Sequence, residues 1–201
     1  MSDATSPLTE ARFCYALLMS PFGARRKRAL TDVELYDYAV GSLARKMRTV
    51  AELKRLLRQR VEPSEGGAMA VEVVIAKLKE QKYLNDSRYA ASYSQYRQSN
   101  EKFGRRRVVT DLKAKGVHSE VTQQAVNAAY EGVNEEQLAR QFLERKRLKK
   151  PQNERESGRI FRTLVRGGFS AGTIFKVLKR WNVDDEVLTA LSSEADESAQ
   201  E

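Results

Sequence analysis

Apolar residues recur at intervals of three and four positions along almost the whole chain, and this periodicity leaves little choice of fold. Leu35, Ala39 and Leu43 follow it near the start, and Ile174 and Leu178 follow it in the last helix that we expect. Such spacing places side chains on one face of an α-helix, whereas a strand needs strict alternation. Alternating β-branched runs are absent, and only four prolines interrupt the pattern. The sequence therefore predicts an all-α protein.

The helical pattern also repeats along the chain. Leu112 and Gly116 align with Leu164 and Gly168 at a constant offset of about fifty residues, which is typical of stacked supersecondary units. Each glycine is placed to end a short helix in the left-handed conformation. We predict an elongated array of three tandem three-helix repeats. The expected boundaries are a partly flexible N-terminal arm at 1–30, repeats at 31–83, 84–132 and 133–191, and an acidic disordered tail at 192–201.

Polar residues mark the starts of several predicted helices. Thr31 with Glu34 and Thr49 with Glu52 have the spacing of a capping box, in which each side chain satisfies a backbone N–H of the first turn. In the later repeats the expected caps are Asn85 or Asp86, and Asn134 followed by Gln137. The stretch 63–67, which contains proline and glycine, is expected to be a connection.

The charge balance points to polyanionic partners. The 201 residues include 36 Lys and Arg against 27 Asp and Glu, a formal net charge of +9. Because the end of the chain after Leu191 is acidic, the basic excess of the predicted repeats is larger still. Such an excess favours binding to nucleic acid or another polyanion.

Residue usage also excludes several classes of protein. Cys14 is the single cysteine and His118 the single histidine, so an internal disulfide is impossible, and a zinc or haem site has too few ligands. We expect a protein of the reducing cytoplasm without a cofactor or metal. The longest apolar run, Phe13 to Met19, is too short to span a bilayer, so we expect no membrane segment.

Lys and Arg gather on the predicted middle helix of each repeat. In the third repeat, spacings of four, three and four place four arginines in one stripe beside the apolar face. For a single helix, an ordinary solvated face explains such charges equally well. Recurrence on three equivalent helices favours an extended polyanion-binding surface. Its expected residues are Lys54, Arg55, Arg58, Arg105, Arg106, Arg107, Lys113, Lys115, Arg155, Arg159, Arg162 and Arg166.

Other functional interpretations are weaker. Tyr89, Tyr93 and Tyr96 could stack on bases, but their helical spacing favours core packing. The helix pair around Gly116 has the outline of a helix-turn-helix, which leaves a stand-alone DNA-binding regulator as the alternative function. No phosphate-binding glycine loop or catalytic triad is present, and we expect no enzymatic activity. The best candidate carboxylates for a metal-dependent nuclease, Asp111 and Glu120, form a poor site.

Three runs in the middle of the chain form a distinctive pattern: Lys82–Ala90 (KYLNDSRYA), Gly104–Val108 (GRRRV) and Leu112–Val117 (LKAKGV). This pattern resembles the core signature of the RecX family of regulatory proteins. Thr49–Leu53 (TVAEL) is similar to the family's first repeat, and Leu138, Ala139 and Phe142 are similar to its third. The resemblance covers about residues 32–182. The family commonly has Gly-Pro where this chain has Phe103-Gly104, and Lys-Gly where it has Arg60-Val61.

The resemblance implies three tandem three-helix repeats that lie in the groove of the RecA recombinase filament. It further implies inhibition of filament extension, ATP hydrolysis, strand exchange and the coprotease activity of RecA, in recombination and the SOS response. The twelve cations would then form a RecA- and DNA-binding surface. We expect a monomer that binds single- or double-stranded DNA weakly and in a salt-dependent manner.

Overall fold

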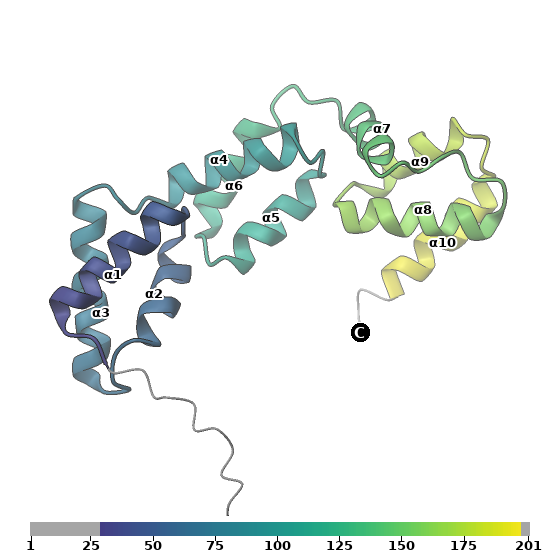
Figure 1. Ribbon diagram of the computed structural model, residues 1–201. Coiled ribbons are helices and arrows are strands. Elements are labelled where there is room, and N and C mark those ends of the chain that lie inside the picture. The colour runs from purple at the N-terminus through teal and green to yellow at the C-terminus, as the bar shows by residue number, and fades with distance from the viewer. Residues whose placement is uncertain (1–28, 198–201) are drawn as a thin grey trace, which may run out of the picture.

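The computed structural model describes residues 29–197, which form ten α-helices and no β-strand. Three groups of helices follow one another along an arc, so the predicted all-α, elongated array of repeats is confirmed (Figure 1). The first repeat contains α1 (Asp32–Arg45), α2 (Val50–Arg58) and α3 (Glu65–Glu80). The second contains α4 (Asp86–Ser99), α5 (Arg105–Ala114) and α6 (Ser119–Ala129). The third contains α7 (Glu135–Arg145), α8 (Glu154–Gly167) and α9 (Ala171–Lys179), and α10 (Asp185–Glu197) follows it.

Side chains cap the helix starts as the sequence predicts. Both capping boxes form: the Thr49 hydroxyl accepts from the Glu52 N–H at 3.1 Å, and the Glu52 carboxylate accepts from the Thr49 N–H at 3.3 Å. Thr31 and Glu34 make the same pair of contacts. Asn85, rather than Asp86, caps α4, and Asn134 caps α7. The prediction of a connection over 63–67 is wrong from Glu65 onward, because the Ser64 side chain caps α3 there.

Each repeat has its own hydrophobic core, as the short apolar faces require. The largest side chains with less than 2% exposure include Leu35, Leu53 and Leu78 in the first core, Leu112 in the second and Phe161 in the third. The sequence assigned Leu84 to the second repeat, but the structure packs this residue in the first core. The predicted arm falls mainly outside the described residues, while Leu30 packs against the first core.

Glycines end two equivalent helices as predicted. Gly116 after α5 has a φ of 74°, and Gly168 after α8 has a φ of 86°. The N–H of the next residue donates to a carbonyl five positions earlier at both ends: Val117 to Leu112 at 3.1 Å and Phe169 to Leu164 at 3.3 Å. The repeat detected in the sequence is thus a repeat of the same helix ending.

Side chains make most of the polar contacts between the first and second repeats, at what we call the first junction. The Thr49 hydroxyl donates to the Lys115 carbonyl at 2.7 Å, and the Val50 N–H donates to the Asp86 carboxylate at 2.9 Å. Gly116 also lies here, and a Cβ atom on it would come within 2.4 Å of the Ala51 Cβ. The start of α2 is therefore fixed by residues of the second repeat.

Backbone contacts join the second and third repeats, at what we call the second junction. The Gly104 N–H donates to the Gly167 carbonyl at 2.8 Å, and the Arg106 N–H donates to the Gly168 carbonyl at 3.2 Å. A Cβ atom on Gly104 would come within 2.3 Å of the Gly168 oxygen. The ring of Phe103 packs against both neighbouring cores. The two repeats approach so closely because both segments carry glycine at the contact.

The prediction of a disordered tail from residue 192 is wrong up to Glu197. Helix α10 continues to that residue, and residues 198–201 lie outside the described part of the chain. Leu188 is buried in the third core, and Leu191, three positions later on the same face, packs against it. The apolar face of α10 thus stabilises a helix where the acidic composition predicted disorder. The last helix is therefore α10, and not α9 as the sequence had predicted.

Candidate functional site

The twelve cations singled out from the sequence lie on α2, α5 and α8, with Lys115 directly after α5. These three helices lie along the inner side of the arc (Figure 1). The helices that carry the cations therefore share one side of the arc. Their partners, however, differ from repeat to repeat.

The cations of α2 are partly neutralised within the first repeat. Lys54 Nζ lies 2.6 Å from Glu72 Oε2, and Arg58 Nη2 lies 3.9 Å from Glu72 Oε1. Arg55 is exposed and makes no ion pair within residues 29–197. One carboxylate on α3 thus lowers the charge that α2 offers to a ligand.

The cations of α5 are divided between internal contacts and solvent. Arg107 Nε lies 3.0 Å from Asp111 Oδ1, and the Arg105 guanidinium donates to Asn127 on α6. Two further residues of this group are exposed and have no ion pair in the described structure: Arg106 and Lys113.

Lys115 has a structural contact in the first junction. Its Nζ donates to Glu52 Oε1 at 2.8 Å and lies 5.6 Å from the ring centroid of Tyr93. The hydrogen bond to Glu52 raises the pKa of Lys115. Burial acts to raise the pKa of Glu52, but the hydrogen bonds from Lys115 and Thr49 outweigh it, so this pKa lies below its ordinary value. The sequence grouped Lys115 with the polyanion-binding cations, and the structure uses its charge to join two repeats.

The stripe on α8 is the clearest group of available cations. Arg155, Arg159, Arg162 and Arg166 are all exposed, and none of them forms an ion pair with another described residue. Arg166 Nε donates to the Arg162 carbonyl at 3.3 Å, which keeps its guanidinium on the stripe. Within the predicted set, α8 therefore offers the largest uncompensated positive charge.

A groove of about 430 Å³ lies where α8 meets the second junction. Its apolar floor includes Phe103 and Phe142, whose ring centroids are 5.6 Å apart. Four cations line it: Arg107 of α5, Lys146 directly after α7, and Arg159 and Arg166 of α8. We call it the junction groove, lined by Phe103, Arg107, Phe142, Lys146, Leu148, Arg159, Thr163, Arg166 and Gly167.

A second hollow of about 240 Å³ shares Leu148 and Arg159 with the junction groove. It adds cations from the connection between α7 and α8, which the sequence analysis did not select: Arg147, Lys149 and Lys150, with Lys146 in the groove itself. The basic run from Arg145 to Lys150 was a usable signal. Most of this run lies in a connection, outside the middle helices to which the prediction was confined.

The tyrosines of α4 divide between core and surface. Tyr89 is buried, and its ring stacks on that of half-buried Tyr93 at 5.9 Å, as expected for core residues. Tyr96 is 55% exposed, so its assignment to the core is wrong. Three positions after Tyr93 its side chain has turned away from the core.

The alternative functions find little support in the geometry. Helix α6, the second helix of the helix-turn-helix-like pair, carries no Lys or Arg. Asp111, half of the candidate nuclease site, has its carboxylate 3.1 Å from Arg97 and 3.0 Å from Arg107. No group of three potential metal ligands exists among residues 29–197.

The fold and these surfaces define a class, the all-helical tandem-repeat proteins with a basic groove. Residues 85–126 match the family model described as RecX, second three-helix domain. A regulatory protein RecX of Myxococcus xanthus is 32% identical over 169 residues, which cover 78% of this chain and 90% of that protein. The chain belongs to the RecX family of regulatory proteins.

Other relatives agree with this assignment. A regulatory protein RecX of Bacillus pumilus is 32% identical over 146 residues, covering 72% of this chain and 54% of that longer protein. The crystal structure of RecX from Lactobacillus salivarius superposes with a TM-score of 0.58 at 21% identity, over 75% of this chain and 96% of that one. That similarity supports the three-repeat fold.

Proposed function

We propose that the protein binds the RecA nucleoprotein filament and inhibits its extension, ATP hydrolysis, strand exchange and coprotease activity. Membership of the RecX family supports a regulatory role. The observation that carries the proposal is the uncompensated arginine stripe of α8 beside the junction groove, on the inner side of an elongated arc. A helical filament presents DNA phosphates and acidic protein surface along a continuous groove, which an extended basic scaffold can follow.

In this proposal the protein acts as a binding module and not as an enzyme. It works as a monomer, and contacts with bare single- or double-stranded DNA are weak because they depend on exposed cations alone. Such contacts weaken steeply with salt, since each neutralised phosphate releases counterion. No helix among residues 29–197 has the length and apolarity needed to cross a membrane. Location in the cytoplasm stays a prediction.

RecA-dependent ATP hydrolysis on single-stranded DNA tests the proposal directly. Increasing concentrations of the protein at low salt should reduce the hydrolysis rate. The double variant Arg159→Glu/Arg166→Glu reverses two groove charges at exposed positions, so half-inhibition should need about tenfold more protein. Arg45→Glu is the matched control, because Arg45 is an exposed cation at the end of α1 that lines neither hollow.

Two results would contradict the proposal. An unchanged rate of ATP hydrolysis with a large excess of wild-type protein would show that the protein does not inhibit RecA. Equal inhibition by the wild type and the double variant would show that the junction groove is not the binding site. Circular dichroism should confirm that the variants keep the helical content of the wild type.

A further inference from the structure

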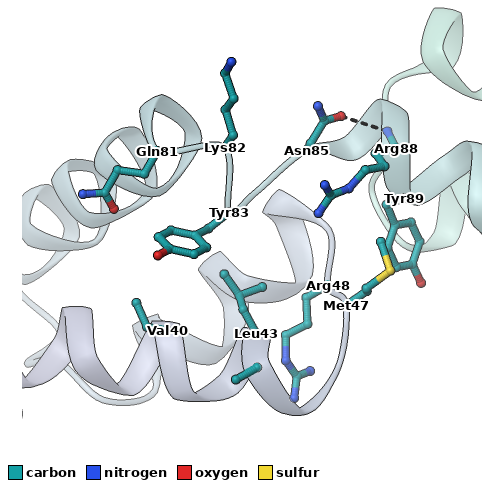
Figure 2. A pocket seen from close by; sticks show the side chains of 11 residues that line it. Val40, Leu43, Met47, Arg48, Gln81, Lys82, Tyr83, Asn85, Arg88 and Tyr89 are labelled. Carbon is teal, nitrogen blue, oxygen red and sulfur yellow. Dashed lines mark hydrogen bonds between the residues drawn. The ribbon is translucent and has the colours of Figure 1, made fainter.

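A pocket of about 420 Å³ lies on the first junction, away from the basic helices described above. Its walls come from the end of α1, the connection between α3 and α4, and the first turn of α4 (Figure 2). That connection crosses the outer side of the arc, whereas α2, α5 and α8 follow the inner side (Figure 1). The pocket is thus separate from the junction groove.

The floor of the pocket is apolar and open to solvent. Figure 2 shows the Tyr83 ring above Val40 and Leu43, with Met47 farther along α1. Tyr83 is 57% exposed and Met47 is 46% exposed, so two of the large apolar side chains left outside the cores line this pocket. An exposed apolar floor of this kind favours a ligand that buries an apolar side chain.

The rim of the pocket is positively charged. Arg88 extends from the start of α4, Arg48 lies beside Met47 after the end of α1, and the Lys82 side chain extends outward next to Tyr83 (Figure 2). Arg48 is held in place by the hydrogen bond from its Nε to the buried Ser42 hydroxyl at 2.8 Å. None of the residues that line the pocket is Asp or Glu.

The backbone is well defined at two of the rim cations. Lys82 has a φ of 61°, a left-handed conformation that a side chain adopts at a cost. The Asn85 side chain accepts from the Arg88 N–H at 2.8 Å and so fixes the start of α4. Two of the rim cations therefore stand at positions set by helix ends and not by a flexible loop.

We propose that this pocket binds an acidic peptide segment of a partner protein, with an apolar residue on the floor and carboxylates on Arg88 and Arg48. The aliphatic side chains and the methionine of the floor suit an apolar side chain. A single-stranded nucleic acid stacks successive bases on several exposed rings, whereas Tyr83 is exposed here and Tyr89 is buried. The acidic segment 192–201 does not fit, because it has no apolar side chain larger than alanine. The site is independent of the junction groove, and its test needs no RecA.

Fluorescence anisotropy with a labelled synthetic peptide, Glu-Glu-Leu-Phe-Glu-Glu, tests the proposal on the full-length protein. The peptide should bind, whereas peptides with lysine in place of glutamate, or serine in place of Leu-Phe, should not. Arg88→Glu should weaken binding by about tenfold, because it replaces a charge-assisted contact by repulsion. Tyr83→Ser should weaken binding by about fivefold through loss of apolar area.

Matched controls exist for both variants. Arg45→Glu changes an exposed arginine, and Tyr96→Ser an exposed tyrosine, and neither residue lines the pocket. Both should bind the peptide as the wild type does. Equal binding by Arg88→Glu, Tyr83→Ser and the wild type would overturn the proposal, as would no binding at about 1 mM peptide. Displacement of the peptide by an oligothymidylate that needs the same two residues would assign the pocket to nucleic acid instead.

Discussion

Gly168 combines two roles at one backbone position. Its φ of 86° ends α8, and its carbonyl accepts the N–H of Arg106 from the neighbouring repeat. A Cβ atom here would lie 2.2 Å from the Arg107 nitrogen, which belongs to backbone and cannot move aside. A side chain is therefore excluded both by the local conformation and by the contact between repeats.

Gly168→Ala should lower the free energy of unfolding by at least about 2 kcal/mol, since it adds backbone strain and a clash at the second junction. Gly172→Ala is the control, because Gly172 lies inside α9 and a Cβ atom on it would meet no described residue within 4 Å. That variant should be neutral, or stabilising by up to about 1 kcal/mol. Urea unfolding curves measure both changes, and similar values for the two variants would contradict this role of Gly168.

At the scale of helices, features decided by a few neighbouring residues could be predicted from the sequence. The capping boxes at Thr31 and Thr49 and the glycine at 116 are of this kind, because the contacts they make span a few positions. Helix α10 was missed because its acidic composition masks a short apolar face, Leu188 and Leu191. The burial of these two residues depends on packing against the third core, which cannot be inferred from the neighbouring sequence.

In the candidate site, too, features within one helix could be predicted, and features formed by packing between helices could not. The stripe from Arg155 to Arg166 could be predicted because it lies on one helix. The junction groove could not, since it forms only where the backbone of Gly104 meets that of Gly167 and brings α5 beside α8. The internal partners of the cations, such as Glu72 for Lys54, also depend on the packing of separate helices.

The burial of α10 predicts that this helix belongs to the third folding unit. Leu188→Ala should lower the free energy of unfolding by about 2–4 kcal/mol, because it leaves a cavity beside fully buried side chains. Val33→Ala, at a position that is 72% exposed on α1, should change it by less than about 0.5 kcal/mol. Thermal or urea unfolding measures both, and a Leu188→Ala protein as stable as the wild type would show that α10 does not contribute to the core.

At the scale of the whole molecule, the two junctions differ in chemistry. The second is held by backbone hydrogen bonds between glycine segments and by the shared ring of Phe103. The first depends on side chains, above all on the ion pair between Glu52 and Lys115. Titration can open an ion pair but not a backbone hydrogen bond, so the first junction is where pH should alter the shape of the arc.

The sign of the pH effect follows from the two pKa shifts. The pKa of Glu52 is lowered, so its stabilisation is present above the ordinary carboxyl pKa and is lost as pH falls through the lowered value. The pKa of Lys115 is raised, so its stabilisation is present below the ordinary lysine pKa and is lost only as pH rises through the raised value. The first junction should therefore keep its geometry from about pH 5 to pH 9 and loosen below about pH 4.

Energy transfer between dyes at Met69→Cys and Glu120→Cys, in a Cys14→Ser background, reports the distance between the first two repeats. Both labelled positions are exposed. In the wild type the transfer efficiency should fall in acid, as the first junction loosens. Glu52→Gln keeps a side chain able to complete the capping box but removes the charge, so its transfer efficiency should already be low at neutral pH and should not fall further in acid. Glu72→Gln, which removes an ion pair inside the first repeat, should behave like the wild type. An acid transition that persists in Glu52→Gln would show that the arc bends through another contact.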